Sequence, residues 1–219
     1  MRKAPKKNGT SLSDQAYNRL EEDIVTLRLA PGEVLSEAAL SESMNIGRTP
    51  IREALQRLAR EGLVLILPRK GILVSELNPG KQLLLLEVRR ELERLLARTG
   101  ALRASDAERQ QLRDIADGMD KAAKSKDDIE FMRLDLMMND LVAEAAHNEF
   151  TNRAIDLMHG LARRFWYSHY KEAADLPLMA RLHANMARQI AAGDADKAGK
   201  ASDDLIDYVE SFTRATVNR

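Results

Sequence analysis

The stretch that decides the fold is "NIGRTPIREALQRLAREG", residues 45–62. Its apolar residues recur at the spacing of three and four that is typical of an amphipathic helix. The sequence predicts a helix capped by Thr49, with Pro50 as its first helical residue (N1) and Gly62 as its stop. The same stretch holds four arginines: Arg48, Arg52, Arg57 and Arg60. Because the whole chain of 219 residues has no formal net charge, any argument for nucleic-acid binding rests on this local placement of cations.

The composition favours a helical, intracellular protein. Aromatic residues make up only 4% of the chain, and Ala, Leu, Glu, Arg and Lys dominate, which favours helix over strand. The absence of cysteine excludes disulfides and thiolate zinc sites and fits a reducing cytoplasm, where we expect the protein. No apolar run approaches the roughly 20 residues of a membrane span, and the basic start lacks the apolar core of a secretory signal. Residues 1–11 are expected to be a disordered basic tail or, alternatively, an arm that touches phosphates.

The pattern changes twice along the chain and so predicts two domains. Two helices precede residue 45, separated by a break at Pro31-Gly32, and two short β-type runs, "LVLILP" and "GILVSEL", follow residue 62. Three helices and a β-hairpin predict a winged helix-turn-helix domain at residues 12–76, followed by a linker at 77–81. Everything from residue 82 to 219 has helical spacing, with a capping box at Ser105 and Glu108, and predicts an antiparallel helical bundle. The expected fold class is therefore mainly α.

The third helix of a winged helix-turn-helix unit lies in the DNA major groove. Arg52 and Gln56 fall on the helical face opposite the apolar residues, and Arg48 and Thr49 stand at the N-terminal end, where base edges are closest. Arginine offers a bidentate fork to guanine, so these residues are candidates for reading DNA.

Arg57 and Arg60 have a simpler interpretation. They lie near Glu53 and Glu61 at helical spacing and can form ion pairs on a solvated face.

The segment "LRLAPGEVLSEAALSESMNIGRTPIREALQRLAREGLVLILPRKGILV" resembles the GntR family of bacterial transcription regulators. The resemblance implies that three residues of the third helix contact bases and phosphates: Arg48, Thr49 and Arg52. It also implies that the tip of the wing approaches the minor groove with Arg69, Lys70 and Gly71. Gly71 suits a close backbone approach or a positive φ. Gly47 departs from the family, which usually has a small hydroxyl residue before the first arginine, so one phosphate hydrogen bond is expected to be missing.

The helical domain resembles the FCD ligand-binding domain of the FadR-type branch of that family. The resemblance rests on "EVRRELERLLA", "LDLMMNDLVAEAAHNEF" and "RLHANMARQIAAGDADKA". It implies six or seven helices around an effector pocket, and a homodimer.

Many FCD domains hold a divalent metal through an Asp-x3-His pair and two later histidines. This chain has Asp135, Asn139 and His183 at three of those positions, but the last falls on Leu205, which cannot coordinate a metal. A zinc or nickel ion at these three residues is one hypothesis. The alternative is that His183 is a hydrogen-bonded pocket or core histidine.

A pocket without metal needs another way to hold an effector, which the resemblance implies is a small organic acid or acyl derivative. Arg89 is the candidate partner for a carboxylate, although it can also pair with Glu93 at i+4. Tyr208 and the segment "RRFWYSHY" can face the same cavity or belong to the core. The predicted effector residues are Arg89, Asp135, Asn139, His183 and Tyr208.

The sequence thus predicts a dimeric regulator, a repressor, that binds a short palindromic operator in double-stranded DNA and responds to a small carboxylate. It predicts no enzyme and no membrane partner. Two alternatives stay open: a helical interaction protein without DNA binding, and a metal-dependent enzyme built on Asp135, His183 and Asp204.

Overall fold

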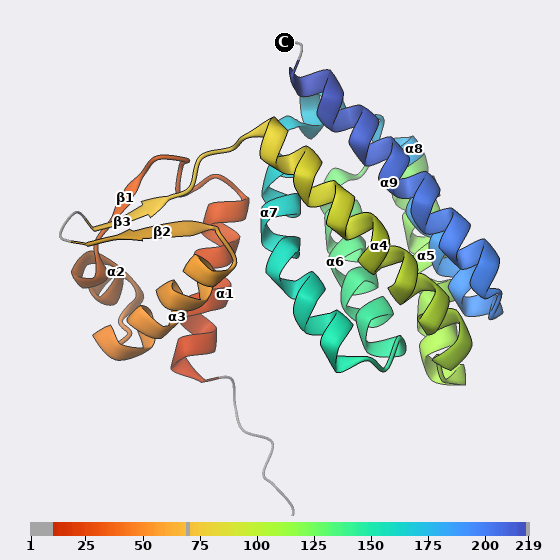
Figure 1. Cartoon of the computed structure of the whole chain (residues 1–219), viewed down its shortest axis with the longest axis horizontal. Coiled ribbons are helices and arrows are strands. Elements are labelled where there is room, and N and C mark those ends of the chain that lie inside the picture. Colours follow the sequence, from red (N-terminus) through yellow and green to blue (C-terminus); the bar gives the residue numbers. More distant parts are fainter. Residues whose placement is uncertain (1–10, 69–70, 218–219) are drawn as a thin grey trace, which may run out of the picture. The chain divides into compact units, whose positions relative to one another are not determined.

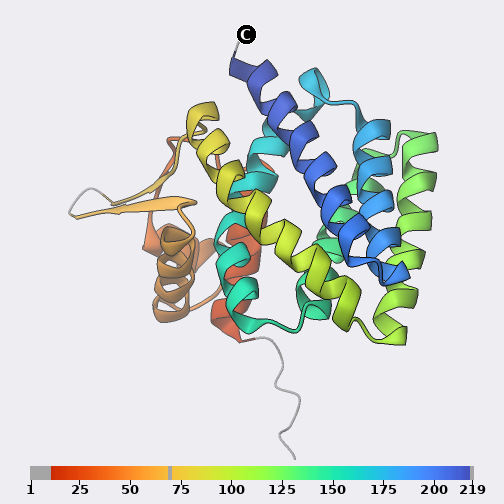
Figure 2. The same cartoon turned by 45° about the vertical axis from the view of Figure 1, so that its right-hand side comes forward.

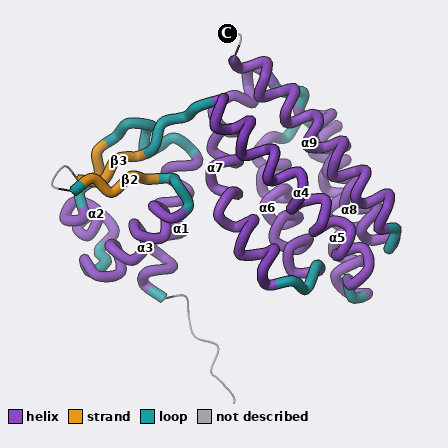
Figure 3. Tube along the Cα trace, viewed as in Figure 1, coloured by secondary structure: helices purple, strands orange, loops and turns teal. Residues whose placement is uncertain are grey.

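The structure, a computed structural model, describes residues 11–68 and 71–217 (Figure 1). The described residues form two compact units. The first unit runs through Leu77 and also includes His159–Ser168; the second comprises Asn78–Met158 and the residues from His169 onward. Helices make up most of both units, and the strands gather in the first (Figure 3). The prediction of a mainly α fold is confirmed, while the predicted tail, apart from Ser11, lies outside the described residues.

The first unit has the predicted three helices and hairpin. Its elements, in chain order, are α1 (Leu12–Val25), β1 (Val34–Leu35), α2 (Glu37–Met44), α3 (Arg48–Arg60), β2 (Val64–Leu67) and β3 (Gly71–Val74). The strands form an antiparallel sheet in the order β1-β3-β2, with Ile66 opposite Ile72 in the hairpin. Strand β1 was not predicted, because two residues are too few to show a period of two.

The start of α3 differs from the prediction. The N-cap is Gly47, with φ −59° and ψ 157°. Thr49 is already inside the helix, so the prediction of a Thr49 cap was wrong. Pro50 is the third residue of the helix rather than the first, so its predicted N1 position was also wrong. It still fits the first turn, because the N–H groups there have no partner within the helix. The helix ends at Arg60, and Gly62 follows with φ +75°, as expected of a glycine after a helix end.

The core of the first unit forms between α1, α3 and the sheet. Helix α3 buries four apolar side chains, Ile51, Ala54, Leu55 and Leu58, in a cluster with Ala16, Leu20 and Ile24 of α1 and Leu35, Ile72 and Val74 of the sheet. This burial holds α3 with one fixed face outward.

Part of α7 (Glu149–Ala173) also belongs to the first unit. Arg163 Nη1 donates to Glu21 Oε1 at 2.9 Å. Arg164 is 1% exposed and donates from Nη2 to Ser75 Oγ and to the Glu76 carbonyl. This use of α7 was not predicted, since Arg164 lies 89 positions from Ser75 and 88 from Glu76 in the chain.

The second unit is an antiparallel helical bundle. It contains α4 (Pro79–Arg103), α5 (Asp106–Ser125), α6 (Asp128–Ala145), α8 (Leu176–Ala192) and α9 (Ala195–Val217), together with the two ends of α7. Helix α4 lies beside α9, and α5 lies beside α8 (Figures 1 and 2). Helix α4 begins at Pro79, inside the stretch expected to be a linker, and the capping box of Ser105 and Glu108 is present as predicted.

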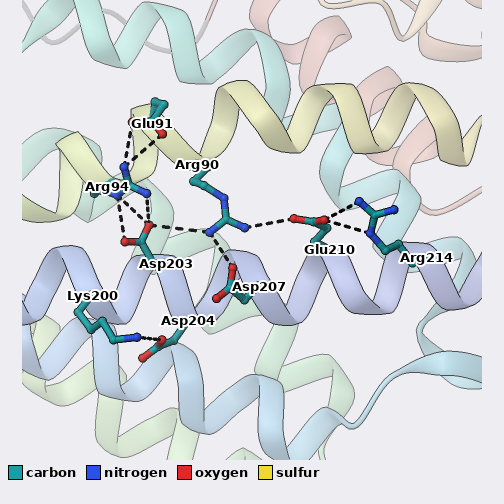
Figure 4. A network of polar contacts seen from close by, with 9 residues as sticks. All are labelled: Arg90, Glu91, Arg94, Lys200, Asp203, Asp204, Asp207, Glu210 and Arg214. Atoms are coloured by element: carbon teal, nitrogen blue, oxygen red, sulfur yellow. Dashed lines mark hydrogen bonds and ion pairs between the residues drawn. The ribbon is translucent and has the colours of Figure 1, made fainter.

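Charged side chains join α4 to α9 (Figure 4). Arg94 donates from Nε to both carboxylate oxygens of Asp203, at 2.8 and 3.0 Å. Arg90 forms ion pairs with Asp207 at 2.7 Å and Glu210 at 3.3 Å. Two arginines one turn apart on α4 therefore fix which of its faces is turned toward α9.

Among the described residues, no helix is long and apolar enough to cross a membrane.

Candidate functional site

The outward face of α3 carries the residues predicted to read DNA. Arg48, Thr49, Arg52 and Gln56 are all exposed, whereas the apolar face of the helix is buried in the core. Arg48 and Thr49 occupy the first turn, where free backbone N–H groups and the helix dipole favour a phosphate. The structure thus brings these four side chains onto one surface.

Arg52 has a partner that the sequence did not reveal. Its Nε donates to Glu37 Oε1 at 3.0 Å, and its Nη2 donates to Glu37 Oε2 at 2.7 Å. The hydrogen bond from Arg52 lowers the pKa of Glu37, so the acid is ionised at neutral pH. Glu37 opens α2 in the segment "LSE", fifteen residues before Arg52. No local spacing rule pairs residues that far apart, which is why the contact was missed.

The bidentate pair leaves part of the guanidinium free. Arginine has five N–H groups, and Glu37 uses one on Nε and one on Nη2. The edge formed by Nη1 and the second hydrogen of Nη2 stays available, and that edge matches O6 and N7 of guanine. Glu37 therefore orients Arg52 and leaves the edge that matches guanine unoccupied by its own carboxylate.

A groove of about 630 Å³ lies beside Arg52. Its walls come from the outer face of α3, the start of α2 and the sheet, and include Glu37, Arg52, Gln56, Ile66, Pro68 and Gly71. Helix α3 and the β2–β3 hairpin thus border one common hollow of the first unit.

Gly71 opens β3 at the tip of the wing with φ +99°, the positive value that the sequence analysis considered for it. A residue with a side chain is strained at this φ, so glycine suits the position. The other two residues predicted for the wing tip, Arg69 and Lys70, lie outside the described residues.

Arg57 has a structural role. Its guanidinium lies 3.6 Å from the centre of the Tyr17 ring, and its Nε donates to Glu61 Oε1 at 3.2 Å. The Tyr17 hydroxyl donates to the other oxygen of Glu61 at 2.8 Å. Burial, together with Glu61, raises the pKa of Tyr17 well above its usual range. The interpretation of Arg57 as a pairing residue is confirmed.

In the second unit, α6 and α8 bring together Asp135, Asn139 and His183. Asp135 Oδ1 lies 2.9 Å from His183 Nε2 and accepts from Asn139 Nδ2 at 3.2 Å. The other ring nitrogen of His183, Nδ1, lies 2.9 Å from the Met179 carbonyl. The edge of the Phe131 ring packs against the imidazole, with 5.5 Å between ring centres. We call these residues, with Arg89 and Glu93 described next, the inner polar cluster.

The surroundings of His183 favour an imidazolium. Burial alone would lower the pKa of His183, but the hydrogen bond and charge of Asp135, the Met179 carbonyl and the charge of Glu93 together raise it. Both ring nitrogens face acceptors, so both are donors when the ring is protonated.

Arg89 on α4 lies close to the same cluster. Its Nε donates to Glu93 Oε1 at 2.7 Å, and both side chains are largely buried. The i+4 pairing weighed from the sequence is therefore present, and Glu93 is the acid whose charge also acts on His183.

Tyr208 is engaged elsewhere. Its hydroxyl accepts a hydrogen bond from the Asp175 backbone N–H at 2.7 Å, where α8 begins. Asp204 forms an ion pair with Lys200 on α9 (Figure 4). The structure places neither side chain in contact with His183.

The residues fit a metal ion poorly. Across the parts of the chain that the structure describes, no three His, Cys, Asp or Glu side chains converge as ligands. Leu205 is buried and apolar at the position of the expected last ligand. Asp135 and His183 are already hydrogen-bonded to each other, and the third predicted ligand, Asn139, is a neutral amide whose Nδ2 donates to Asp135, which makes it a weak ligand for zinc or nickel.

A three-helix unit with a β-hairpin wing, a third helix with exposed arginines and a separate helical bundle are the features of a winged helix-turn-helix transcription regulator. Residues 12–74 match the model of the bacterial regulatory proteins of the gntR family, and residues 84–208, more than half of the chain, match the FCD domain. The chain belongs to the gntR family and carries an FCD domain. This family and the relatives below are transcription regulators rather than enzymes.

Two relatives show how the similarity is distributed. The chain is 25% identical over 203 residues to the HTH-type transcriptional repressor RspR of Escherichia coli K12, covering 93% of this chain and 89% of RspR. It is 45% identical over 74 residues to an HTH-type transcriptional regulator in an unstable DNA locus of Streptomyces ambofaciens, covering 34% of this chain and only 31% of that relative.

Among solved structures, McbR/YncC of E. coli has the same fold. The TM-score is 0.80 at 17% identity, with 96% of this chain and all of the McbR/YncC chain covered.

Proposed function

We propose that the protein is a ligand-responsive repressor that binds a short palindromic operator as a homodimer. The observation that carries this proposal is the outward face of α3, which presents Arg48, Thr49, Arg52 and Gln56 beside the groove. The pairing of Arg52 with Glu37 supports it, because an oriented guanidinium reads a base better than a mobile one.

A palindromic operator follows from the dimer. Two copies related by a two-fold axis present two reader helices to half-sites that are mirrored in the same way. The similarity to RspR, which is named a transcriptional repressor, supports repression as the direction of control.

The effector is proposed to bind in the inner polar cluster. Arg89 and a protonated His183 are two cations, paired with Glu93 and Asp135. A carboxylate of the ligand would replace these two acids as the partner of the cations. Binding would thereby release two acids and rearrange contacts among α4, α6 and α8. Such a ligand changes DNA binding only if its affinity differs between the DNA-binding state and the released state.

A DNA-binding titration tests the main proposal. Fluorescence anisotropy would follow the full-length protein on its own upstream intergenic region, at several salt concentrations, with scrambled DNA as the reference. Arg52→Ala should weaken specific binding. Arg133→Ala is the matched control, because Arg133 on α6 is 56% exposed, compared with 58% for Arg52, and also pairs with one acid. Equal binding by both variants would contradict the assignment of the reader helix, and no binding by any form would favour the interaction-protein alternative.

The effector proposal needs a second titration. Small monocarboxylic and dicarboxylic acids would be added to the preformed complex of protein and DNA. One of them should dissociate the complex of the unmodified protein but not that of Arg89→Gln, which loses the positive charge. If every acid were without effect, or if Arg89→Gln responded normally, the carboxylate site would be wrong while the DNA-binding proposal stood.

A further inference from the structure

The wing of the first unit, the hairpin of β2 and β3, is closed at its base by Ser75. This residue directly follows β3, and its backbone N–H donates to the Leu63 carbonyl, just before β2, at 3.0 Å. The Ser75 hydroxyl donates to the Gly62 carbonyl at 2.7 Å. Gly62 lies in the turn that follows α3. One serine therefore joins the end of the wing to the end of the helix that carries the exposed arginines.

Arg164, in the part of α7 that belongs to the first unit, holds this serine in place. Its Nη2 donates to Ser75 Oγ at 3.0 Å and to the Glu76 carbonyl at 3.3 Å. The Ser75 hydroxyl thus accepts from Arg164 and donates to Gly62. Two hydrogen bonds in series therefore run from α7 to the turn after α3, and they use the hydroxyl both as donor and as acceptor.

Helix α7 also packs closely against the same base of the wing. A Cβ added at Gly160 would lie 2.8 Å from Leu63 Cδ1, and Leu63 is fully buried. The next residue, Leu161, packs against the core of the first unit, and its Cδ1 would lie 3.6 Å from a Cβ at Gly62. Arg164 follows Gly160 by one helical turn and so lies on the same face of α7. Both residues that lead from α3 to β2 therefore meet this stretch of α7.

Stability of the fold does not account for an arginine at position 164. The side chain is 1% exposed, and within the described parts of the chain its Nε and Nη1 have no hydrogen-bond partner. Burial lowers the pKa of Arg164, although the charge of Glu76 opposes this shift. A buried cation with unpaired donors costs stability, and an apolar side chain of similar volume often replaces such an ion without loss. The contribution of the arginine therefore lies in the contacts of Nη2.

We propose that Arg164 is a positioning residue for DNA reading, which holds the wing in a fixed position relative to α3 by way of Ser75. Because its side chain is buried, Arg164 acts without touching DNA. It lies 89 positions from Ser75 in the chain, so no local sequence pattern connects it with the DNA-binding surface. The inference rests on the proposed function, because it takes α3 and the wing to contact one operator together.

A released wing should affect specific binding more than non-specific binding. Helix α3 and the wing fit one operator only in one relative position, so a mobile wing has to be ordered when the complex forms, and this ordering lowers the affinity. Non-specific binding depends on the number of cations near phosphates and tolerates a mobile wing. The ratio of the two affinities is therefore the quantity to measure.

The main test replaces Arg164 with Met in the full-length protein. Fluorescence anisotropy would measure binding to the upstream intergenic region and to scrambled DNA. Arg164→Met should lower operator affinity about 3- to 10-fold and change the affinity for scrambled DNA little. Its melting temperature should not fall, because the variant loses a buried cation with unpaired donors. Arg164→Lys, which keeps the charge and a donor, should recover part of the operator affinity.

Arg163→Met is the matched control. Arg163 is the neighbouring residue of α7 and also donates within the first unit, but its acceptor is Glu21 on α1 instead of the wing. Loss of this pair should lower the melting temperature, because the Glu21 side chain is only 14% exposed, and should leave operator affinity unchanged. Equal losses of operator affinity in Arg163→Met and Arg164→Met would overturn the proposal, because they would assign the effect to the docking of α7 as a whole.

Ser75→Ala removes the link and keeps the arginine. It should weaken operator binding about as much as Arg164→Met does, and the double variant should bind no more weakly than either single variant. Amide hydrogen exchange at residue 75 should become faster in Arg164→Met and stay unchanged in Arg163→Met. Should Arg164→Met fail to fold, Ser75→Ala and Arg164→Lys decide in its place.

Three results would contradict the positioning role. These are operator affinity equal to that of the wild type in Arg164→Met, the same result in Ser75→Ala, and additive losses in the double variant. Each of them would leave the proposed function standing, because the wild-type protein would still bind its operator. A wild-type protein that binds operator and scrambled DNA equally would instead reject the proposed function, and the positioning role with it.

Discussion

Replacing Glu37 with Gln separates two roles that an acid beside a reader arginine can have. If Glu37 orients Arg52, its loss makes the guanidinium mobile and weakens the reading of a base. If Glu37 merely competes with DNA for Arg52, its loss strengthens binding. The geometry favours orientation, because the carboxylate binds Nε and one hydrogen of Nη2 and leaves the edge that fits guanine free.

The expected magnitude follows from the contacts. A bidentate contact from arginine to guanine corresponds to a discrimination of about 5- to 150-fold in affinity, so Arg52→Ala should lose binding in that range. Glu37→Gln keeps the arginine and loses only its orientation, and should therefore cost a smaller part, about 3- to 10-fold, on operator DNA. On scrambled DNA the same change removes a negative charge next to the phosphates and should tighten binding. The ratio of specific to non-specific affinity should therefore fall.

The assay is a double-mutant cycle measured by fluorescence anisotropy at fixed salt. The variants are Glu37→Gln, Arg52→Ala and the combination of both, and thermal unfolding is measured in parallel. Because the Arg52–Glu37 pair is largely exposed, the melting temperature should change little, so that affinity reports on DNA contacts alone. If orientation is the role of Glu37, the double variant binds operator DNA like Arg52→Ala alone. Tighter operator binding by Glu37→Gln, or additive losses in the double variant, would refute the reasoning.

Three further predictions concern single positions. Gly47→Ser should raise operator affinity about 2- to 10-fold, because it adds a hydroxyl that can donate to a phosphate. The site has room for the side chain, since the nearest atom to a new Cβ is Pro50 Cδ at 3.8 Å and the backbone already has N-cap geometry. Titration with operator DNA measures the change. Gly193→Ala should lower the free energy of unfolding by about 1–2 kcal/mol, because residue 193 has φ +78°, which strains any residue with a side chain. The new Cβ would also lie 3.0 Å from the guanidinium of Arg109. Urea unfolding measures the change. His183→Met should remove a pH-dependent part of stability. The raised pKa of His183 means that this part is fully present below the ordinary value of 6.5 and is lost as the pH rises through the higher folded-state value. The stability difference between wild type and variant should therefore shrink as the pH rises above 6.5.

Each of these has a result that contradicts it. Weaker operator binding by Gly47→Ser would mean that the N-terminus of α3 approaches DNA too closely for any side chain. An unchanged unfolding free energy in Gly193→Ala would mean that the end of α8 relaxes without strain. A stability difference that grows with pH for His183→Met would mean that the folded protein holds a neutral imidazole.

Much of the fold was predictable because its signals are local. The period of the apolar residues placed nearly all the helices, and the capping box at Ser105 and Glu108 marked the start of α5. The errors occurred where a local rule had two solutions. Thr49 and Gly47 are both acceptable N-caps, and the packing of Ile51 and Leu55 in the core selected the longer helix that begins at Arg48.

The candidate sites were predictable only in part. The residues on the outward face of α3 follow from helical spacing once its buried face is known. The spacing of Asp135 and Asn139 on one turn was readable in the same way, and their meeting with His183 was an expectation from resemblance alone. The hydrogen bond between the Asp175 backbone N–H and the Tyr208 hydroxyl had no signal in the sequence, because the two residues lie 33 positions apart.

By itself, the sequence determined the helical class and the outward placement of Arg48, Thr49, Arg52 and Gln56 on α3, because these depend on interactions within a few residues of chain. Only the tertiary structure decided that Glu37 holds Arg52, that Asp135 faces His183, and that Arg164 of α7 binds the chain at Ser75 and Glu76. These contacts join residues 15 to 89 positions apart, and such pairs meet only when whole helices pack together. The physical reason is that hydrophobic burial sets how the helices pack, and the polar partners are then whatever side chains that packing brings within hydrogen-bonding distance.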